Sequence, residues 1–457
     1  MKKIIVYILS LISSLVIVAC AGYPTSQISS NDTNTVMTVV ALTLSAMPAG
    51  SPTAAPTITS TPEPVAAFTP TPEPTTLRVV YSRAGGIWIW SEGGQPEKLS
   101  SSGIDIQPRI SSDGKIVVFA RNNELYAVNA DGSNLRKIVS KEYLNPYRPE
   151  GYKWIWAEYY DWMLDTHTLY FTTKSQLGDD GFPIDQFDLH RVNVDTGEVS
   201  IVLPAGQGGI PYFSPNGQTL AVARSEAVSL ANVDGTNWRT ALTFRHVSTY
   251  SEWGFIPTIV PLPNGNGFRT IIPVFHVDPM DNSDEPSKLW DIPLAGEPVL
   301  LHSFLLASGI PHKTLSPSGK IVFSIKDANS NYSLCLYQPD VARETCIPKA
   351  DREVYANNWA SDESKYTFQA SNKILVESDY VFETTYYVAS AVEPNNPPVE
   401  IDPYVWLTWV NPDQYVYIDQ DWNLRLATFN GPSIQIHNGV KNQASKDGIL
   451  PFDFSTR

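Results

Sequence analysis

A short phrase recurs along this chain at nearly regular spacing. Each copy has an apolar or aromatic residue, a turn rich in Ser, Pro, Asp, Asn or Gly, and then a short apolar strand. The copies lie 44 to 54 residues apart and begin at Ile110, Trp162, Phe213, Pro261, Leu315, Trp359, Trp409 and Phe454. A fixed period of this size, with strands and turns in every unit, is typical of a β-propeller. We therefore predict an all-β propeller.

Most units are predicted to hold four antiparallel strands, separated by tight turns such as Asp113-Gly114. The unit that begins at Leu77 lacks its first strand, whereas the terminal run GILPFDFST resembles a first strand with nothing after it. We expect this C-terminal strand to complete the first blade and to close the ring, which removes open sheet edges. The phrases predict eight blades. Seven is the alternative, because the Pro261 unit is difficult to divide into strands.

The N-terminus has the pattern of an export signal. Lys2-Lys3 precede an apolar stretch of 15 residues, Ile4 to Val18, which is too short for a typical membrane-spanning helix. The stretch ends in Ile17-Val18-Ala19-Cys20, which resembles the bacterial lipobox. The resemblance implies cleavage of a signal peptide, residues 1–19, and lipidation of Cys20. An ordinary secretory signal is the alternative.

Residues 20–76 are rich in Thr, Ser and Pro and contain Thr-Pro-Glu-Pro twice. Proline fixes φ and removes a backbone donor, so this stretch is predicted to be a disordered tether. The propeller would then occupy residues 77–457. We expect an extracytoplasmic protein, anchored by the lipid on Cys20 to a bacterial membrane or the cell surface.

The chain of 457 residues has a formal charge of −15 and no long basic run, which argues against nucleic-acid binding. Its seven histidines never fall at a metal-ligand spacing such as H-x-x-x-H. We expect no cofactor. Calcium at two acidic inserts, residues 178–188 and 278–285, is the alternative, although neither matches a calcium-loop motif.

Cys335 and Cys346 lie symmetrically about the tip of a predicted hairpin. Because an exported protein can oxidise such a pair, we predict a disulfide between them. The alternative is two reduced cysteines packed as small apolar residues.

The strings FSPNGQTLAVAR and ISSDGKIVVFAR resemble the WD-like repeats of the TolB family, and also the N-terminal propeller of dipeptidyl peptidases. The resemblance covers residues 77–457 and implies a propeller used for protein or peptide contact around a central channel. TolB-type proteins usually have fewer blades and a separate N-terminal domain. The peptidases carry a G-x-S-x-G nucleophile motif, which this sequence lacks.

Antiparallel strand order places the second-to-third strand loops and the blade-to-blade connections at one rim of the ring. We expect both acidic inserts at this rim, together with six candidate ligand-binding aromatics: Tyr152, Trp154, Trp156, Tyr250, Trp253 and Trp406. Aromatic rings beside carboxylates suit sugar, peptide or cationic ligands. The alternative is that these rings only pack blade against blade.

We therefore expect a monomeric, lipid-anchored, non-catalytic propeller that binds an envelope protein, peptide or glycan through this aromatic and acidic face. Two alternatives stay open. One is a propeller enzyme acting on glycans or peptides, with a carboxylate such as Asp185 or Asp284 in the reaction. The other is a structural protein of the envelope.

Overall fold

The computed structural model describes residues 76–457 apart from 180, 248–253, 274–285, 305–314, 327–328, 330, 351, 377–378 and 441–449. These residues belong to the second of the chain's two units, Pro70–Arg457. The predicted signal peptide, Cys20 and the tether before residue 76 lie outside the described residues, as do Tyr250, Trp253 and the second acidic insert. Among the described helices, none has the length and hydrophobicity that a bilayer crossing requires.

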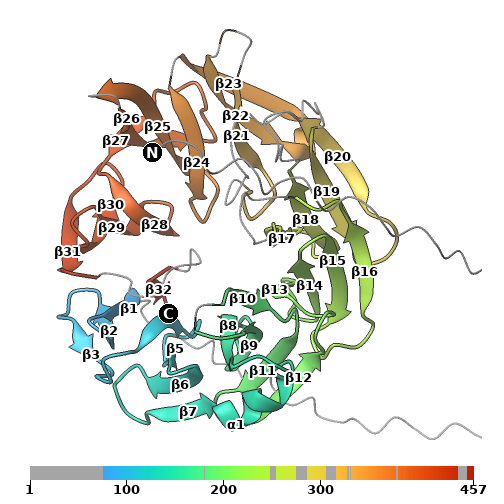
Figure 1. Cartoon of the computed structure of the whole chain (residues 1–457). Helices are drawn as coiled ribbons and strands as arrows, with labels where there is room; N and C mark the ends of the chain where they lie inside the picture. Colours follow the sequence, from blue (N-terminus) through green and yellow to red (C-terminus); the bar gives the residue numbers. More distant parts are fainter. Residues whose placement is uncertain are drawn as a thin grey trace, which may run out of the picture. The chain divides into compact units, whose positions relative to one another are not determined.

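The described residues form eight antiparallel sheets arranged in a ring, which confirms the predicted eight-bladed propeller (Figure 1). Blade 1 comprises β1 (Arg78–Arg83), β2 (Gly86–Ser91), β3 (Glu97–Lys98) and β32 (Phe452–Ser455). Blade 2 comprises β4 (Ile106–Ile110), β5 (Ile116–Arg121), β6 (Glu124–Asn129) and β7 (Arg136–Val139). The short helix α1 (Lys141–Leu144) and the 3-10 turn η1 (Asn145–Tyr147) then lead to blade 3.

Blades 3 to 5 follow in chain order. Blade 3 comprises β8 (Trp154–Trp162), β9 (Thr168–Gln176), β10 (Pro183–Asp185), β11 (Leu189–Asn193) and β12 (Val199–Leu203). Blade 4 comprises β13 (Ile210–Phe213), β14 (Thr219–Arg224), β15 (Ala227–Asn232) and β16 (Arg239–Thr243). Blade 5 comprises β17 (Ile259–Pro261), β18 (Gly267–Ile272), β19 (Ser287–Pro293) and β20 (Val299–Phe304). The unit at Pro261 is thus a complete blade.

Blades 6 to 8 complete the ring. Blade 6 comprises β21 (Ile321–Lys326), β22 (Tyr332–Gln338) and β23 (Arg343–Ala350), with the 3-10 turn η2 (Pro339–Val341) between the last two. Blade 7 comprises β24 (Glu353–Trp359), β25 (Lys365–Val376), β26 (Asp379–Ser390) and β27 (Val399–Ile401). Blade 8 comprises β28 (Tyr404–Asn411), β29 (Gln414–Asp419), β30 (Leu424–Thr428) and β31 (Ser433–His437).

Two blades depart from the regular four-strand pattern. In blade 6 the expected first strand is reduced, within the described residues, to a single bridge between Leu315 and Ile321. In blade 3 part of the first acidic insert forms β10, which pairs antiparallel with β9. The insert is therefore in part an added strand, and not wholly a loop.

The hydrophobic core lies between neighbouring blades. Val118 and Leu125 of blade 2 pack with Ile155, Leu169 and Phe171 of blade 3, and all five are almost completely buried. Because a blade has a neighbour on each side, both faces of its central strands are apolar, as in the nearly continuous apolar run of β5. Stacking of the sheets therefore fixes the position of each blade against the next.

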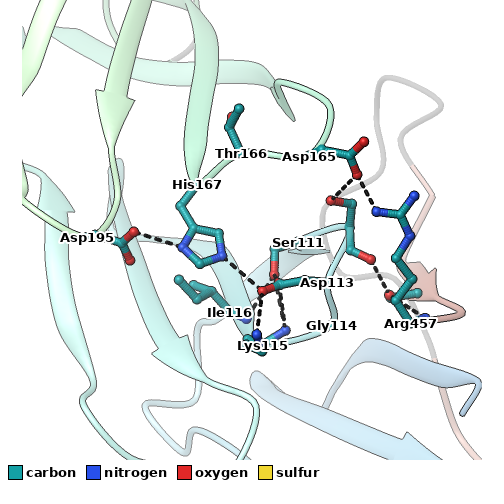
Figure 2. Close-up of polar contacts among 12 residues, drawn as sticks. Ser111, Asp113, Gly114, Lys115, Ile116, Asp165, Thr166, His167, Asp195 and Arg457 are labelled. Atoms are coloured by element: carbon teal, nitrogen blue, oxygen red, sulfur yellow. Dashed lines mark hydrogen bonds and ion pairs between the residues drawn. The ribbon is translucent and has the colours of Figure 1, made fainter. Parts of the chain in front are cut away.

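The C-terminal strand closes the ring as predicted. β32 pairs antiparallel with β1, with Arg78 opposite Ser455 and Tyr81 opposite Phe452. The Oγ of Ser455 donates to the carbonyl of Ser112 at 2.9 Å, and the guanidinium of Arg457 pairs with the carboxylate of Asp165 (Figure 2). The chain terminus therefore contacts blades 1, 2 and 3 at once.

Candidate functional site

The two central aromatic candidates lie on β8, the first strand of blade 3. Side chains alternate between the two faces of a strand, so Trp154 and Trp156 share one face. The side chain of Ile155 between them is buried in the core shared with blade 2, whereas 39% of Trp154 is exposed. The local sequence thus uses the aliphatic residue for packing, leaves the indole of Trp154 exposed and leaves that of Trp156 half-buried.

Each indole N–H is held by a carboxylate. The Nε1 of Trp154 donates to Asp179 at 3.1 Å, and the Nε1 of Trp156 donates to the buried Glu158 at 2.6 Å. Lys153 also donates to Asp179, at 2.7 Å, and its ammonium lies 5.0 Å from the centre of the Trp154 ring. These bonds satisfy the polar edges of both rings and fix how the rings are turned.

The carboxylate of Asp179 is kept ionised by the same contacts. Hydrogen bonds from Lys153 and then Trp154, with the positive charge of Lys153, lower the pKa of Asp179 below its ordinary value. Asp179 comes from the first acidic insert, so the structure does bring part of that insert beside the aromatic residues. Its role there is to orient an indole.

A tight turn of blade 2 faces these rings. Asn122 and Asn123 join β5 to β6, with φ angles of 52° and 65°. A two-residue hairpin of type I′ requires positive φ at both positions, and asparagine tolerates that conformation better than most residues. The turn therefore places two side-chain amides at the same rim as the start of β8.

Six side chains line an open pocket between blades 2 and 3. Its volume is about 430 Å³, and it is lined by Asn122, Asn123, Lys141, Trp154, Trp156 and Gln176. Sites for small organic ligands commonly have volumes of about 300–1,000 Å³. The lining combines two indoles, three amides and one ammonium group. We call it the Trp154–Trp156 pocket.

The remaining predicted ligand-binding residues lie elsewhere. Tyr152 is half-buried just before β8 and does not line the pocket. Trp406 packs beside the core between blades 8 and 1, with its ring 5.9 Å from that of Trp422. Tyr250 and Trp253 lie outside the described residues. The structure thus brings two of the six candidates, Trp154 and Trp156, into one cavity.

Sequence reasoning missed four residues of this pocket: Asn122, Asn123, Lys141 and Gln176. Gln176 lies directly opposite Trp154 on β9. The Asn-Asn turn and the connection that holds Lys141 were both expected at the aromatic rim. Their expected position at this rim could have suggested these residues from the sequence. Only the packing of blade 2 against blade 3 shows which turn contacts which strand.

Two other acids of the first insert, Asp185 and Asp188, make internal contacts, whereas Asp180 lies outside the described residues. Asp188 is buried and accepts hydrogen bonds from the Thr173 backbone at 2.8 Å and from the His190 ring at 3.0 Å. Asp185 lies 3.9 Å from the buried ammonium of Lys174. These acids therefore stabilise blade 3, and Asp284 lies outside the described residues.

The two cysteines are direct cross-strand neighbours. Cys335 on β22 lies opposite Cys346 on β23, and the structure joins their sulfurs in a disulfide. Within the described ranges, the one group of three residues with the spacing of metal ligands is this pair together with Glu344. Sulfurs bonded to each other do not serve as thiolate ligands.

A second polar cluster lies at the opposite rim. The ring of His167 lies between two carboxylates, with Nδ1 2.8 Å from Asp195 and Nε2 3.3 Å from Asp113 (Figure 2). Burial alone would raise the pKa of Asp113, but hydrogen bonds from Ser111 and the Lys115 backbone, with His167 nearby, lower it to about 2. The cluster connects turns of blades 2 and 3, so we interpret it as a contact that fastens the blades together.

A third group lies on the innermost strands of blades 1 to 3. Burial and the nearby charge of Asp161 raise the pKa of Asp453 to about 6, although Arg109 opposes the change. One carboxylate oxygen of Asp453 accepts a hydrogen bond from the Ile110 backbone at 2.9 Å. Asp453 therefore combines a raised pKa with a position on the strand that closes the ring.

No family model matches this chain, and no curated protein matches it in sequence. Several solved structures resemble its fold. An oligogalacturonate lyase from Vibrio parahaemolyticus is 14% identical, with a TM-score of 0.41 over 62% of this chain and 79% of that one. TolB from Acinetobacter baumannii is 16% identical, with a TM-score of 0.31 over 60% of this chain and 64% of that one. Tricorn protease is 11% identical, with a TM-score of 0.36 over 79% of this chain.

This chain spans only 44% of the length of tricorn protease. At such low identities, these likenesses concern the propeller fold alone, because one fold carries many unrelated functions. The β-propeller itself is shown by the eight blades. The function must be argued from the site.

Proposed function

We propose that this protein is a lipid-anchored, extracytoplasmic propeller that binds an envelope protein, peptide or glycan through the Trp154–Trp156 pocket. The observation that carries the proposal is the pair of indoles whose N–H groups are held by Asp179 and Glu158. Rings fixed in this way lose little conformational freedom when a ligand binds, which favours affinity. The anchor would be the lipid on Cys20, and the propeller would act as a monomer.

The main experiment is a comparison of captured partners. Cells expressing the full chain are cross-linked, and partners of the wild type are compared with those of Trp154→Ala/Trp156→Ala. The matched control is Trp238→Ala, because Trp238 belongs to blade 4 and does not line this pocket; its Nε1 donates to the Gln207 carbonyl in the connection between blades 3 and 4. Loss of a partner from the pocket variant alone would support the proposal. Equal recovery from all three proteins would refute it.

The anchor has its own test. A Cys20→Ala variant should move from the membrane fraction to the soluble extracytoplasmic fraction, and it should not incorporate labelled fatty acid. A variant that remains in the membrane fraction to the same extent as the wild type would contradict anchoring at Cys20.

A second candidate function is an enzyme acting on glycans or peptides. The observation that favours it is Asp453, because a carboxyl group with a pKa of about 6 is suited to general acid catalysis near neutral pH. Asp453→Asn should then abolish turnover of a cleaved substrate while leaving its binding intact. A variant that retained full turnover would exclude Asp453 as the catalytic acid.

A further inference from the structure

We infer that the Trp154–Trp156 pocket binds a glycan whose sugar rings carry anionic groups. This inference rests on the proposed function and specifies its ligand. Three properties of the pocket support it: which parts of the indoles are available, which polar groups surround them, and which charged group the lining holds.

The indoles offer their faces and not their polar edges. Because both N–H groups already donate to carboxylates, neither is available to a ligand without breaking a bond. What remains, apart from the face of Trp154 over which the Lys153 ammonium lies, is flat aromatic surface, which suits the C–H face of a pyranose ring. Residues two apart on a strand are separated by roughly 6.6 Å, so Trp154 and Trp156 form two platforms for successive rings of one chain.

Three amides complement the hydroxyl groups of a sugar. An amide side chain both donates and accepts hydrogen bonds, as a hydroxyl group does. Asn122 and Asn123 supply two such groups from the turn. Gln176 beside Trp154 supplies a third, of which one N–H already donates to the Asp179 carbonyl at 3.2 Å. Extended peptides are often recognised by main-chain pairing with a strand edge. The lining residues here come instead from a turn, the start of a helix and three positions on two paired strands.

The charge of the pocket comes from one lysine. Lys141 is the only charged residue among the six that line the cavity, and its charge interacts with the carboxylates of Glu124 and Glu142 outside the lining. Glu124 beside it already accepts from the ammonium of Lys137 at 2.8 Å and from the Lys141 backbone at 3.1 Å. The lining itself therefore carries one ammonium group and no carboxylate. An anionic group on the ligand would pair with Lys141.

The test is calorimetry with matched pairs of oligosaccharides and the full-length protein in detergent. The probes are hexuronic-acid oligosaccharides, the same oligosaccharides after carboxyl reduction, a sulfated oligosaccharide with its desulfated form, and a Glu-rich peptide. We expect the wild type to prefer each acidic sugar to its neutral partner by about two- to fivefold, and more strongly at low salt. The carboxylate and sulfate pairs show which anion is recognised.

Two variants separate the contributions. Trp154→Ala/Trp156→Ala should weaken binding of acidic and neutral sugars alike by about tenfold or more. Lys141→Gln should weaken binding of the acidic sugar only. The affinities for each acidic sugar and its neutral partner should then become nearly equal. Lys115→Gln, at the opposite rim, should change neither affinity. Circular dichroism and melting temperature confirm that each variant is folded.

Several outcomes would overturn the inference. Equal binding of acidic and neutral sugars, or a preference that survives Lys141→Gln, would refute the anionic part. Binding of the Glu-rich peptide but of no sugar would assign the pocket to peptides. If no sugar binds while captured partners still depend on the tryptophans, the glycan inference fails and the proposed function stands. If no sugar binds and the captured partners do not depend on the tryptophans, the glycan inference and the proposed function both fail.

Discussion

Asp453 gives the sharpest prediction for the stability of the ring. It lies on β32, and its pKa is raised from an ordinary 3.8 to about 6. A carboxyl group whose pKa is higher in the folded state than in the unfolded state favours folding most when it is protonated. Its contribution is therefore complete below about pH 4 and is lost as the pH rises through about 6.

The size of the effect follows from the change in pKa. One pKa unit corresponds to about 1.36 kcal/mol, so complete ionisation would destabilise the folded state by about 3 kcal/mol at most. Asp453 is half-buried, so water screens part of this effect and we expect about 1–3 kcal/mol. Asn in place of Asp keeps an oxygen that can accept from the Ile110 backbone but removes the ionisation.

Urea unfolding of the wild type and Asp453→Asn at pH 4 and pH 8, followed by tryptophan fluorescence, measures the effect. At pH 8 the variant should have a higher free energy of unfolding by about 1–3 kcal/mol, and at pH 4 the two should agree. Asp421→Asn, at an exposed position, controls for the substitution itself. A variant that is no more stable than the wild type at pH 8 would refute the reasoning.

Three further predictions concern the fold. Cys335→Ser/Cys346→Ser should lower the free energy of unfolding by about 2–3 kcal/mol. Reductant should lower the free energy of unfolding of the wild type and leave that of the variant unchanged. Phe452→Ala, at a side chain that is 1% exposed in the closing strand, should cost about 3–5 kcal/mol in urea unfolding, whereas Leu164→Ala at an exposed position should cost under about 0.5 kcal/mol. Asp113→Asn should be less stable than the wild type by under about 1 kcal/mol at pH 7, because the lowered pKa of this half-exposed carboxyl stabilises the fold above about pH 4. The difference should disappear as the pH falls to about 2, and a difference that persists there would contradict the assignment.

The sequence by itself determined the architecture. Strand length, turn residues and the repeat period are local properties, so they indicate blades without knowledge of any long-range contact. The mismatch between the two ends of the chain, an incomplete first unit and a lone last strand, predicted that β32 pairs with β1. Alternation along β8 likewise predicted that Trp154 and Trp156 share a face.

Only the tertiary structure decided which residues meet at the pocket. Asn122 and Lys141 are separated from Trp154 along the chain, and their common cavity depends on how blade 2 packs against blade 3. The same holds for Asp453, whose neighbours Arg109 and Asp161 come from two other blades. Local sequence sets the form of each blade, but the contacts between blades depend on the packing of whole sheets and on the closure of the ring. The pocket and the raised pKa of Asp453 therefore follow from that packing and closure, and the repeat alone does not determine them.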